Sequence, residues 1–213
     1  MSKGFDQLTV LDHPLIEHKM AKLRDEQTGR KKFRELVREI TLLEVYEATR
    51  ALPTQACEIT TPVAGMQASR LKDPAPVIVP ILRAGLGMVE GVTDLIPTCR
   101  VGHLGMYRDE ETFQPVPYYA KLPDGLGESP IFVLDPMLAT GGSGSAAVSY
   151  VKEQGGRDIV FMCIVAARPG VTALLKDHPD VRIYAAGFDE ELTPSAYITP
   201  GLGDAGDRLY GTL

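Results

Sequence analysis

Residues 131–145, IFVLDPMLATGGSGS, contain the stretch that decides the fold. The run Ile131–Leu134 is apolar, short and continuous, which predicts a buried strand. Asp135 stands directly after it, and the turn Thr140-Gly141-Gly142-Ser143 then opens a predicted helix over residues 142–154. A strand, a glycine-rich turn and a helix in this order predict one unit of a parallel α/β sheet.

The same alternation continues on both sides of this unit. Continuous apolar runs predict further strands, and apolar residues at helical spacing predict further helices. The expected strands are residues 76–82, 100–107, 116–122, 159–167 and 181–186, and the expected helices are residues 14–25, 31–50, 85–96 and 171–177. Pro117 suits an edge strand or a hairpin. We therefore expect one α/β domain over residues 1–213, with a mainly parallel sheet flanked by helices.

Composition excludes several classes of protein. The chain is 44% hydrophobic and 23% charged, as globular chains are, which argues against disorder. The longest apolar run, residues 159–167, is far shorter than the roughly 20 residues of a membrane helix. Residues 1–6 lack an apolar signal region, and the three cysteines form neither a disulfide framework nor a zinc pattern. We therefore expect a cytoplasmic protein without a membrane segment.

The charge is acidic overall but uneven. A net charge of −6 argues against general nucleic-acid binding. The segment from Lys19 to Arg38, however, holds eight Lys or Arg and three Asp or Glu residues. This basic segment is explained either by a solvated helix face or by a surface for an anionic effector or a partner subunit.

The loop after the first quoted strand has the composition of a phosphate site. Backbone N–H groups at a helix N-terminus bind anions, and glycines let the backbone approach the anion closely. Thr140 and Ser143 add hydroxyl donors, and Asp135 can accept hydrogen bonds from sugar hydroxyls. The loop lacks the Gly-Lys-Ser/Thr of a Walker motif. An ordinary glycine-rich turn with a capped helix is the alternative.

Two further segments offer arginines to an anion. In VPILRAGLGM, residues 79–88, Arg83 lies in a second strand-to-helix turn and can grip phosphate in a bidentate manner. In MYRDEETFQPVPYYA, residues 106–120, Arg108 begins a polar, proline-rich stretch that predicts a long hairpin able to act as a lid. A helix-opening turn and a surface hairpin are the simpler explanations of these two segments.

The segment YITPGLGDAG, residues 197–206, is rich in glycine close to the C-terminus. Such a backbone can lie against a flat ligand and offer it main-chain groups, although a plain series of turns has the same composition. Ligands of parallel sheets bind beyond the carboxyl ends of the strands. That rule selects the segments after Leu82, Leu134 and Ala167.

Together these segments resemble the uracil phosphoribosyltransferase family. The resemblance rests on PILRAGLGM (80–88), GMYRDEETFQPVPYYAKLP (105–123), VLDPMLATGGS (133–143) and YITPGLGDAGDRLYGT (197–212), and it covers nearly the whole chain. It implies a type I phosphoribosyltransferase fold with a hairpin lid. It also implies a small base-binding hood, formed by the N-terminal helices and about residues 187–213.

The resemblance implies a reaction and its site. Uracil and 5-phospho-α-D-ribose 1-diphosphate would give UMP and diphosphate in pyrimidine salvage, with Mg²⁺ carried by the diphosphate and not by protein ligands. The phosphoribosyl site of the family maps to Arg83, Arg108, Asp135, Pro136, Met137, Leu138, Ala139, Thr140, Gly141, Gly142, Ser143 and Asp204. Its uracil contacts map to Ile198, Gly203, Asp204 and Ala205, and its catalytic residues to Asp204 and Arg108. Whether Asp204 acts as a base or only positions the substrate is left open.

Alternatives remain within this fold. One is a pyrimidine-responsive RNA-binding regulator, which the acidic charge disfavours. Another is transfer to a different base. Pro136 stands where many type I members carry a second acid, which counts against an orotate or hypoxanthine enzyme. The family also suggests a homodimer or homotetramer and, in some members, a GTP effector.

Overall fold

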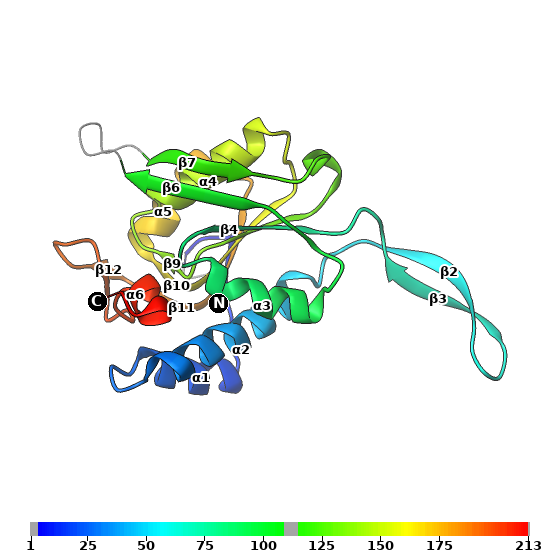
Figure 1. The fold of residues 1–213 in the computed structure, drawn as a ribbon, viewed down its shortest axis with the longest axis horizontal. Coiled ribbons are helices and arrows are strands. Elements are labelled where there is room, and N and C mark those ends of the chain that lie inside the picture. The colour runs from blue at the N-terminus through cyan, green and yellow to red at the C-terminus, as the bar shows by residue number, and fades with distance from the viewer. Residues whose placement is uncertain (1–3, 109–114, 213) are drawn as a thin grey trace.

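The computed structural model describes residues 4–108 and 115–212. A mainly parallel sheet forms its centre, and only its β6–β7 edge pair is antiparallel (Figure 1). The main strands, in spatial order, are β1 (Leu8–Val10), β11 (Arg182–Asp189), β10 (Ile159–Ala167), β8 (Ile131–Leu134), β4 (Val77–Leu82), β6 (His103–Arg108) and β7 (Pro115–Lys121). Two short strands extend it, β5 (Arg100–Val101) beside β4 and β9 (Met137–Leu138) beside β10.

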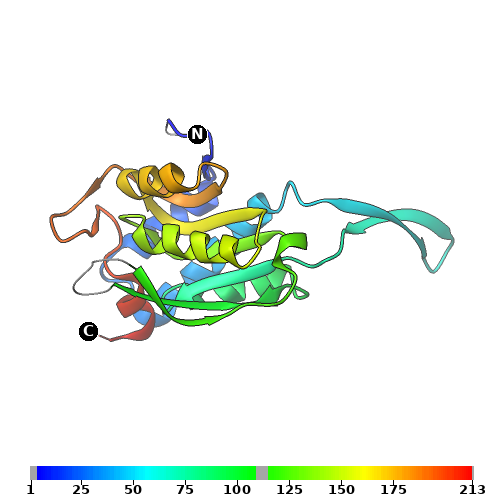
Figure 2. The same cartoon turned by 90° about the horizontal axis from the view of Figure 1, so that it is seen from above.

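Helices cover both faces of the sheet (Figures 1 and 2). One face carries α1 (Pro14–Arg24), α2 (Arg30–Ala48) and α3 (Leu86–Leu95), and the other carries α4 (Gly142–Glu153) and α5 (Arg168–Asp177). All nine residues of β10 are buried because helices pack on both its sides. This explains why the central strands read as continuous apolar runs rather than as alternating ones.

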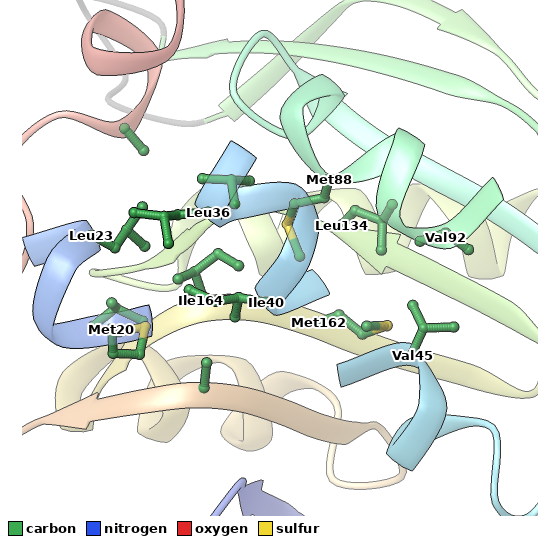
Figure 3. Packing of buried hydrophobic residues seen from close by; sticks show 14 of the residues in the cluster. Met20, Leu23, Leu36, Ile40, Val45, Met88, Val92, Leu134, Met162 and Ile164 are labelled. Carbon is green, nitrogen blue, oxygen red and sulfur yellow. The ribbon is translucent and has the colours of Figure 1, made fainter. Parts of the chain in front are cut away.

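The larger of the two cores lies between the sheet and the three helices α1–α3 (Figure 3). Met162 and Ile164 of β10 point into it from the sheet, and Ile40 of α2 and Met88 of α3 meet them from the helices. This core fixes the N-terminal helices against the sheet, which places the end of α1 close to the C-terminal segment.

The predicted alternation of strands and helices is confirmed, and most boundaries agree within two residues, with three larger differences. The strand expected over residues 100–107 is divided into β5 and β6 at Gly102. Helix α5 begins at Arg168 rather than at 171, because Pro169 fits the first turn of a helix. Strand β11 continues to Asp189. Pro117 lies in the edge strand β7, as expected, beside an irregularity in its pairing with β6.

Several elements were not predicted. They are β1, the hairpin of β2 (Thr54–Thr60) and β3 (Gly65–Leu71), the one-turn 3-10 helix Leu126–Glu128, the short strand β9, the strand pair β12 (Glu191–Leu192) and β13 (Ile198–Thr199), and α6 (Ala205–Tyr210). The β2–β3 hairpin projects far from the body (Figures 1 and 2). Within it only the facing residues Cys57 and Ala68 are half-buried, and the rest of both strands is exposed.

The hairpin predicted to act as a lid is present as β6 and β7. Residues 109–114 and the side chain of Arg108 lie outside the described part of the chain, so the lid stays a prediction. No helix within residues 4–108 or 115–212 is long and apolar enough to cross a membrane.

Candidate active site

A pocket of about 380 Å³ opens beyond the carboxyl ends of the central strands. Three stretches of chain line it: the turn after β4, the loop after β8, and the C-terminal segment. The lining residues are Ala84, Asp135, Met137, Ala139, Ser195, Ala196, Tyr197, Ile198, Gly203, Asp204, Ala205 and Gly206. Two of the three places selected from the sequence thus meet at one site, together with the glycine-rich C-terminal segment.

The third selected place, the segment after Ala167, does not line the pocket. It packs against the loop proposed to bind phosphate and supports it. Gly170 packs so closely under the loop that a Cβ there would collide with the carbonyl oxygens of Leu138 and Ala139. A Cβ at Gly141, where φ is +86°, would lie 2.7 Å from the carbonyl oxygen of Gly170. Glycine is therefore required on both sides of this contact.

The loop leads into the N-terminus of α4, which lies at the surface. Gly141 is the N-cap and α4 begins at Gly142. Thr140 and Ser143 are exposed, so their hydroxyls are open to a ligand. The first-turn N–H groups of a helix have no carbonyl partner within the helix. The geometry therefore fits the anion site that the sequence predicts.

Asp135 lies in the pocket wall where β8 ends. The Met137 N–H donates to its carboxylate at 3.3 Å, and its own N–H donates to the Met162 carbonyl at 3.1 Å. Desolvation by the surrounding protein raises the pKa of Asp135 to about 7. A carboxyl group with such a pKa in a pocket is typical of a functional site.

Some neighbours of Asp135 line the pocket, and the others pack against the sheet. Met137 and Ala139 line the pocket, whereas Pro136 and Leu138 are buried. The Pro136 carbonyl accepts a hydrogen bond from the Val165 N–H at 3.0 Å, and Leu138 pairs with β10. Alternate residues of this loop thus face the pocket and the sheet.

Arg83 lies beside the pocket rather than in its wall. Its side chain is exposed, its Nη2 lies 3.9 Å from Asp207 Oδ1, and its guanidinium is 6.0 Å from the centre of the Tyr210 ring. The Tyr210 hydroxyl donates to the Arg83 carbonyl at 3.0 Å. Sequence reasoning did not find these contacts, because it predicted no helix over residues 205–210.

The C-terminal segment forms the remaining wall. Ile198 is buried in β13, Gly203 has a φ of +80°, and Asp204 caps α6 by accepting the Asp207 N–H at 2.8 Å. All four residues that the resemblance assigns to uracil line the pocket. Sequence reasoning did not name Ala84, Ser195, Ala196, Tyr197 and Gly206 as site residues, although each lies in or next to a segment that it had singled out.

Comparison with known proteins decides the family. A family model described as uracil phosphoribosyltransferase matches residues 10–212. The chain belongs to the uracil phosphoribosyltransferase family. The uracil phosphoribosyltransferase of Symbiobacterium thermophilum is 56% identical over 206 residues, which cover 97% of this chain and 99% of that protein. That of Macrococcus caseolyticus is 57% identical over 203 residues, covering 95% and 97%.

Solved structures confirm the phosphoribosyltransferase fold. The AQ2163 protein of Aquifex aeolicus superposes with a TM-score of 0.91 at 36% identity, over 96% of this chain and 98% of that one. An adenine phosphoribosyltransferase of Trypanosoma brucei superposes with a TM-score of 0.61 at 11% identity, over 95% and 90%. The latter likeness shows the fold alone. The predicted family, fold class and enzyme class are thus confirmed.

Proposed function

We propose that this member of the uracil phosphoribosyltransferase family transfers the phosphoribosyl group of phosphoribosyl diphosphate to N1 of uracil. The products are UMP and diphosphate. One observation carries the proposal: a single pocket is lined by Asp135, by Met137 and Ala139 of the loop that leads to the N-terminus of α4, and by a backbone-rich C-terminal wall suited to a small planar base. Membership of the family supports the same reaction.

The loop Asp135–Ser143 would hold the ribose phosphate. The first-turn N–H groups of α4 and the hydroxyls of Thr140 and Ser143 bind the 5′-phosphate. Asp135 accepts hydrogen bonds from the ribose hydroxyls, a role that requires its carboxylate form. Because α5 supports the loop through Gly170, the loop is already in place before the substrate binds.

The leaving diphosphate meets Arg83 and Arg108 in this proposal. Guanidinium groups stabilise the charge that develops on the diphosphate as its bond to C1′ breaks. Among the described residues, no three His, Cys, Asp or Glu side chains lie close enough together to hold a metal ion. The pocket wall does carry the carboxylates of Asp135 and Asp204, which would hold, through its bound waters, a Mg²⁺ ion that arrives on the diphosphate. Bound there, Mg²⁺ would neutralise diphosphate charge.

The base lies against the C-terminal wall. Main-chain groups of Ile198 and of Gly203–Ala205 match the alternating acceptors and donor along one edge of uracil, and a base that leaves them unpaired is rejected. N1 attacks C1′ from the face opposite the diphosphate, through an oxocarbenium-like state. The C1′–N1 bond forms, the C1′–O bond breaks with its electron pair leaving on the diphosphate, and Asp204 accepts the N1 proton.

A product assay tests the proposed function. The protein is mixed with Mg²⁺, phosphoribosyl diphosphate and equimolar uracil, orotate, hypoxanthine and xanthine, and the nucleotides are then separated. We expect UMP alone. A different monophosphate would keep the phosphate loop but overturn the assignment of the 198–205 wall to uracil. No nucleotide, even with GTP added, would refute the transferase activity.

The β2–β3 hairpin supports a homodimer or homotetramer. It exposes four apolar side chains, Leu71 at its root and Ile59, Val63 and Met66 toward its tip. An isolated two-stranded hairpin is only marginally stable in water, so a second copy of the chain that covers this hairpin would stabilise it. Sedimentation of the wild type and of a Val63→Lys, Met66→Lys variant tests this. Equal masses for both would count against the hairpin as the contact.

The basic segment is partly neutralised within the chain. Lys19 pairs with Glu39 at 2.5 Å and Arg38 with Asp94 at 2.6 Å, while Arg24 and Lys32 also have carboxylate partners. These pairs favour a structural role for the segment. A GTP effector that binds at Lys31 and Lys32 stays a separate proposal, which loss of GTP activation in a Lys31→Glu, Lys32→Glu variant would support and unchanged activation would refute.

A cytoplasmic location is proposed from the state of the cysteine thiols. Cys57, Cys99 and Cys163 are all free, as expected of a protein from the reducing cytoplasm.

A further inference from the structure

The wall proposed to bind uracil offers main-chain groups to the base. The positions of these groups therefore depend on what holds the backbone of the wall. The wall runs from Ile198 through a tight turn to Ala205. At the turn, Gly201 has a φ of +57°, and a Cβ there would collide with the Ile198 carbonyl oxygen. A side chain can change rotamer to meet a ligand, whereas a main-chain donor or acceptor can only be moved with the segment itself.

One part-buried ion pair, Arg24–Asp189, holds both polar groups of Gly201. Asp189, at the end of β11, is only 8% exposed, and its carboxylate accepts Arg24 Nη1 at 2.7 Å and Nη2 at 2.9 Å. The same carboxylate accepts the Gly201 N–H at 3.0 Å, and Arg24 Nη1 also donates to the Gly201 carbonyl at 2.7 Å. Arg24 is the last residue of α1, so this contact spans 177 positions of sequence.

A second arginine holds the next carbonyl. Arg208 Nη1 donates to Leu202 O at 2.9 Å and to Leu23 O at 2.8 Å, and its Nη2 donates to Asp25 O at 2.7 Å. The Arg208 guanidinium also lies 4.3 Å from the centre of the Phe33 ring. The carbonyls of two consecutive turn residues are therefore fastened to the end of α1. Gly203, which lines the pocket, comes directly after them.

We propose that Arg24 and Asp189 are positioning residues that set the affinity for uracil by fixing the backbone of the base-binding wall. Neither side chain lines the pocket. They act through Gly201, whose N–H and C=O they hold. Hydrogen bonds weaken steeply with distance and angle, so a small shift of this segment costs contacts to the base. The proposal rests on the proposed function, because it takes uracil to be the ligand of this wall.

Kinetics with each substrate varied in turn test the proposal. Arg24→Lys keeps the charge but loses the bidentate fork, and Asp189→Asn keeps the shape but loses the charge. We expect the KM for uracil to rise about tenfold in each variant, equivalent to the loss of one or two hydrogen bonds, with kcat and the KM for phosphoribosyl diphosphate changed less than about twofold. Millimolar guanidinium should lower the raised KM of an Arg24→Ala variant. The control is Arg38→Ala, which breaks the Arg38–Asp94 pair between α2 and α3 and should leave both KM values unchanged.

Two kinetic results would overturn the proposal. One is a KM for uracil within about twofold of the wild type in all variants. The other is an equal worsening of both KM values and kcat, which indicates general loss of structure. Hydrogen exchange of the peptide covering residues 198–206 supplies a readout that needs no activity: Arg24→Lys should speed its exchange, and Arg38→Ala should not. Absence of UMP from the wild type would refute the proposed function. Unchanged hydrogen exchange in Arg24→Lys would refute the claim that Arg24 fixes the backbone of the wall.

Discussion

At the residue scale, Asp135 combines a structural and a chemical role. It ends a fully buried strand, and the desolvation that this position imposes raises the pKa of Asp135 to about 7. Its proposed task, accepting hydrogen bonds from ribose hydroxyls, requires the carboxylate. Substrate binding at a pH below 7 should therefore release a proton from this group.

The affinity for phosphoribosyl diphosphate should consequently fall as the pH is lowered through 7, by up to about tenfold per pH unit. Titration calorimetry between about pH 5.5 and 8 measures this, in buffers of differing ionisation heat. Asp135→Asn should bind more weakly at pH 8 and lose the proton release, keeping only the titration of the ligand phosphate near pH 6. The same pH dependence in both proteins would contradict the role of Asp135.

Asp204 is the second acid of the pocket. Its carboxylate caps α6 by accepting the Asp207 N–H at 2.8 Å, and an asparagine oxygen can make the same bond. Asp204→Asn thus removes the charge and the proton acceptor while the cap is kept. We expect kcat to fall by about a hundredfold with an unchanged melting temperature. Near-normal turnover would remove Asp204 from any role as a base.

At the element scale, α6 connects the two halves of the site. Its N-cap lies in the pocket wall, and Asp207 and Tyr210, three residues apart on one face, contact Arg83 and its turn. Burial raises the pKa of Tyr210, so its hydroxyl stays protonated and donates to the Arg83 carbonyl. The helix therefore carries the base-binding segment and steadies the arginine proposed for the diphosphate.

Tyr210→Phe deletes that hydroxyl and keeps the ring beside Arg83. The KM for phosphoribosyl diphosphate should rise about three- to tenfold, as expected for one hydrogen bond, and the KM for uracil should not change. Tyr46→Phe, at an exposed tyrosine near the C-terminal end of α2, is the matched control. A change confined to uracil would show that α6 does not position Arg83.

The same elements show what the sequence can and cannot predict. The apolar runs of β8 and β10 predict strands because helices bury both faces of the sheet there. The hairpin β2–β3 escapes prediction because neither of its faces packs on the body, so no alternation arises. Helix α6 has only six residues, two of them Gly206 and Asp207, which is too short for a periodic pattern.

Candidate site residues that lie close together in the sequence can be predicted, and contacts between distant residues cannot. Asp135 and the Thr140–Ser143 turn are local to one strand–turn–helix unit, so their spacing predicts them. The contact of Arg24 with Asp189 joins residues 165 positions apart, and no local pattern carries it. Fastening of this kind becomes visible only when the whole chain is folded.

At the scale of the whole molecule, one buried carboxyl group makes the stability of the fold depend on pH. Glu44 of α2 is fully buried beneath the helix, and desolvation raises its pKa well above the usual value. The folded protein therefore keeps this proton at pH values where the unfolded chain has lost it. The resulting stability is fully present below about pH 4.5 and is lost as the pH rises toward the pKa of the folded state.

Glu44→Gln should remove this pH dependence. Relative to the wild type, the free energy of unfolding of the variant should rise with pH, by up to about 1.4 kcal/mol per pH unit, when measured in urea from pH 5 to 9. Glu39→Gln, on the same helix, is the control: pairing with Lys19 lowers the pKa of Glu39, so its difference from the wild type should be constant above about pH 6. A constant difference for Glu44→Gln as well would contradict the account.

The central claim is that one pocket holds the phosphate of the product on the α4 loop and its base against the C-terminal wall. A crystal structure of the protein with UMP tests it most directly. We predict the 5′-phosphate on the N–H groups of Thr140–Ser143, the ribose hydroxyls on Asp135, and the uracil edge on the main chain between Ile198 and Ala205. A phosphate bound elsewhere, or a base outside this wall, would contradict the account.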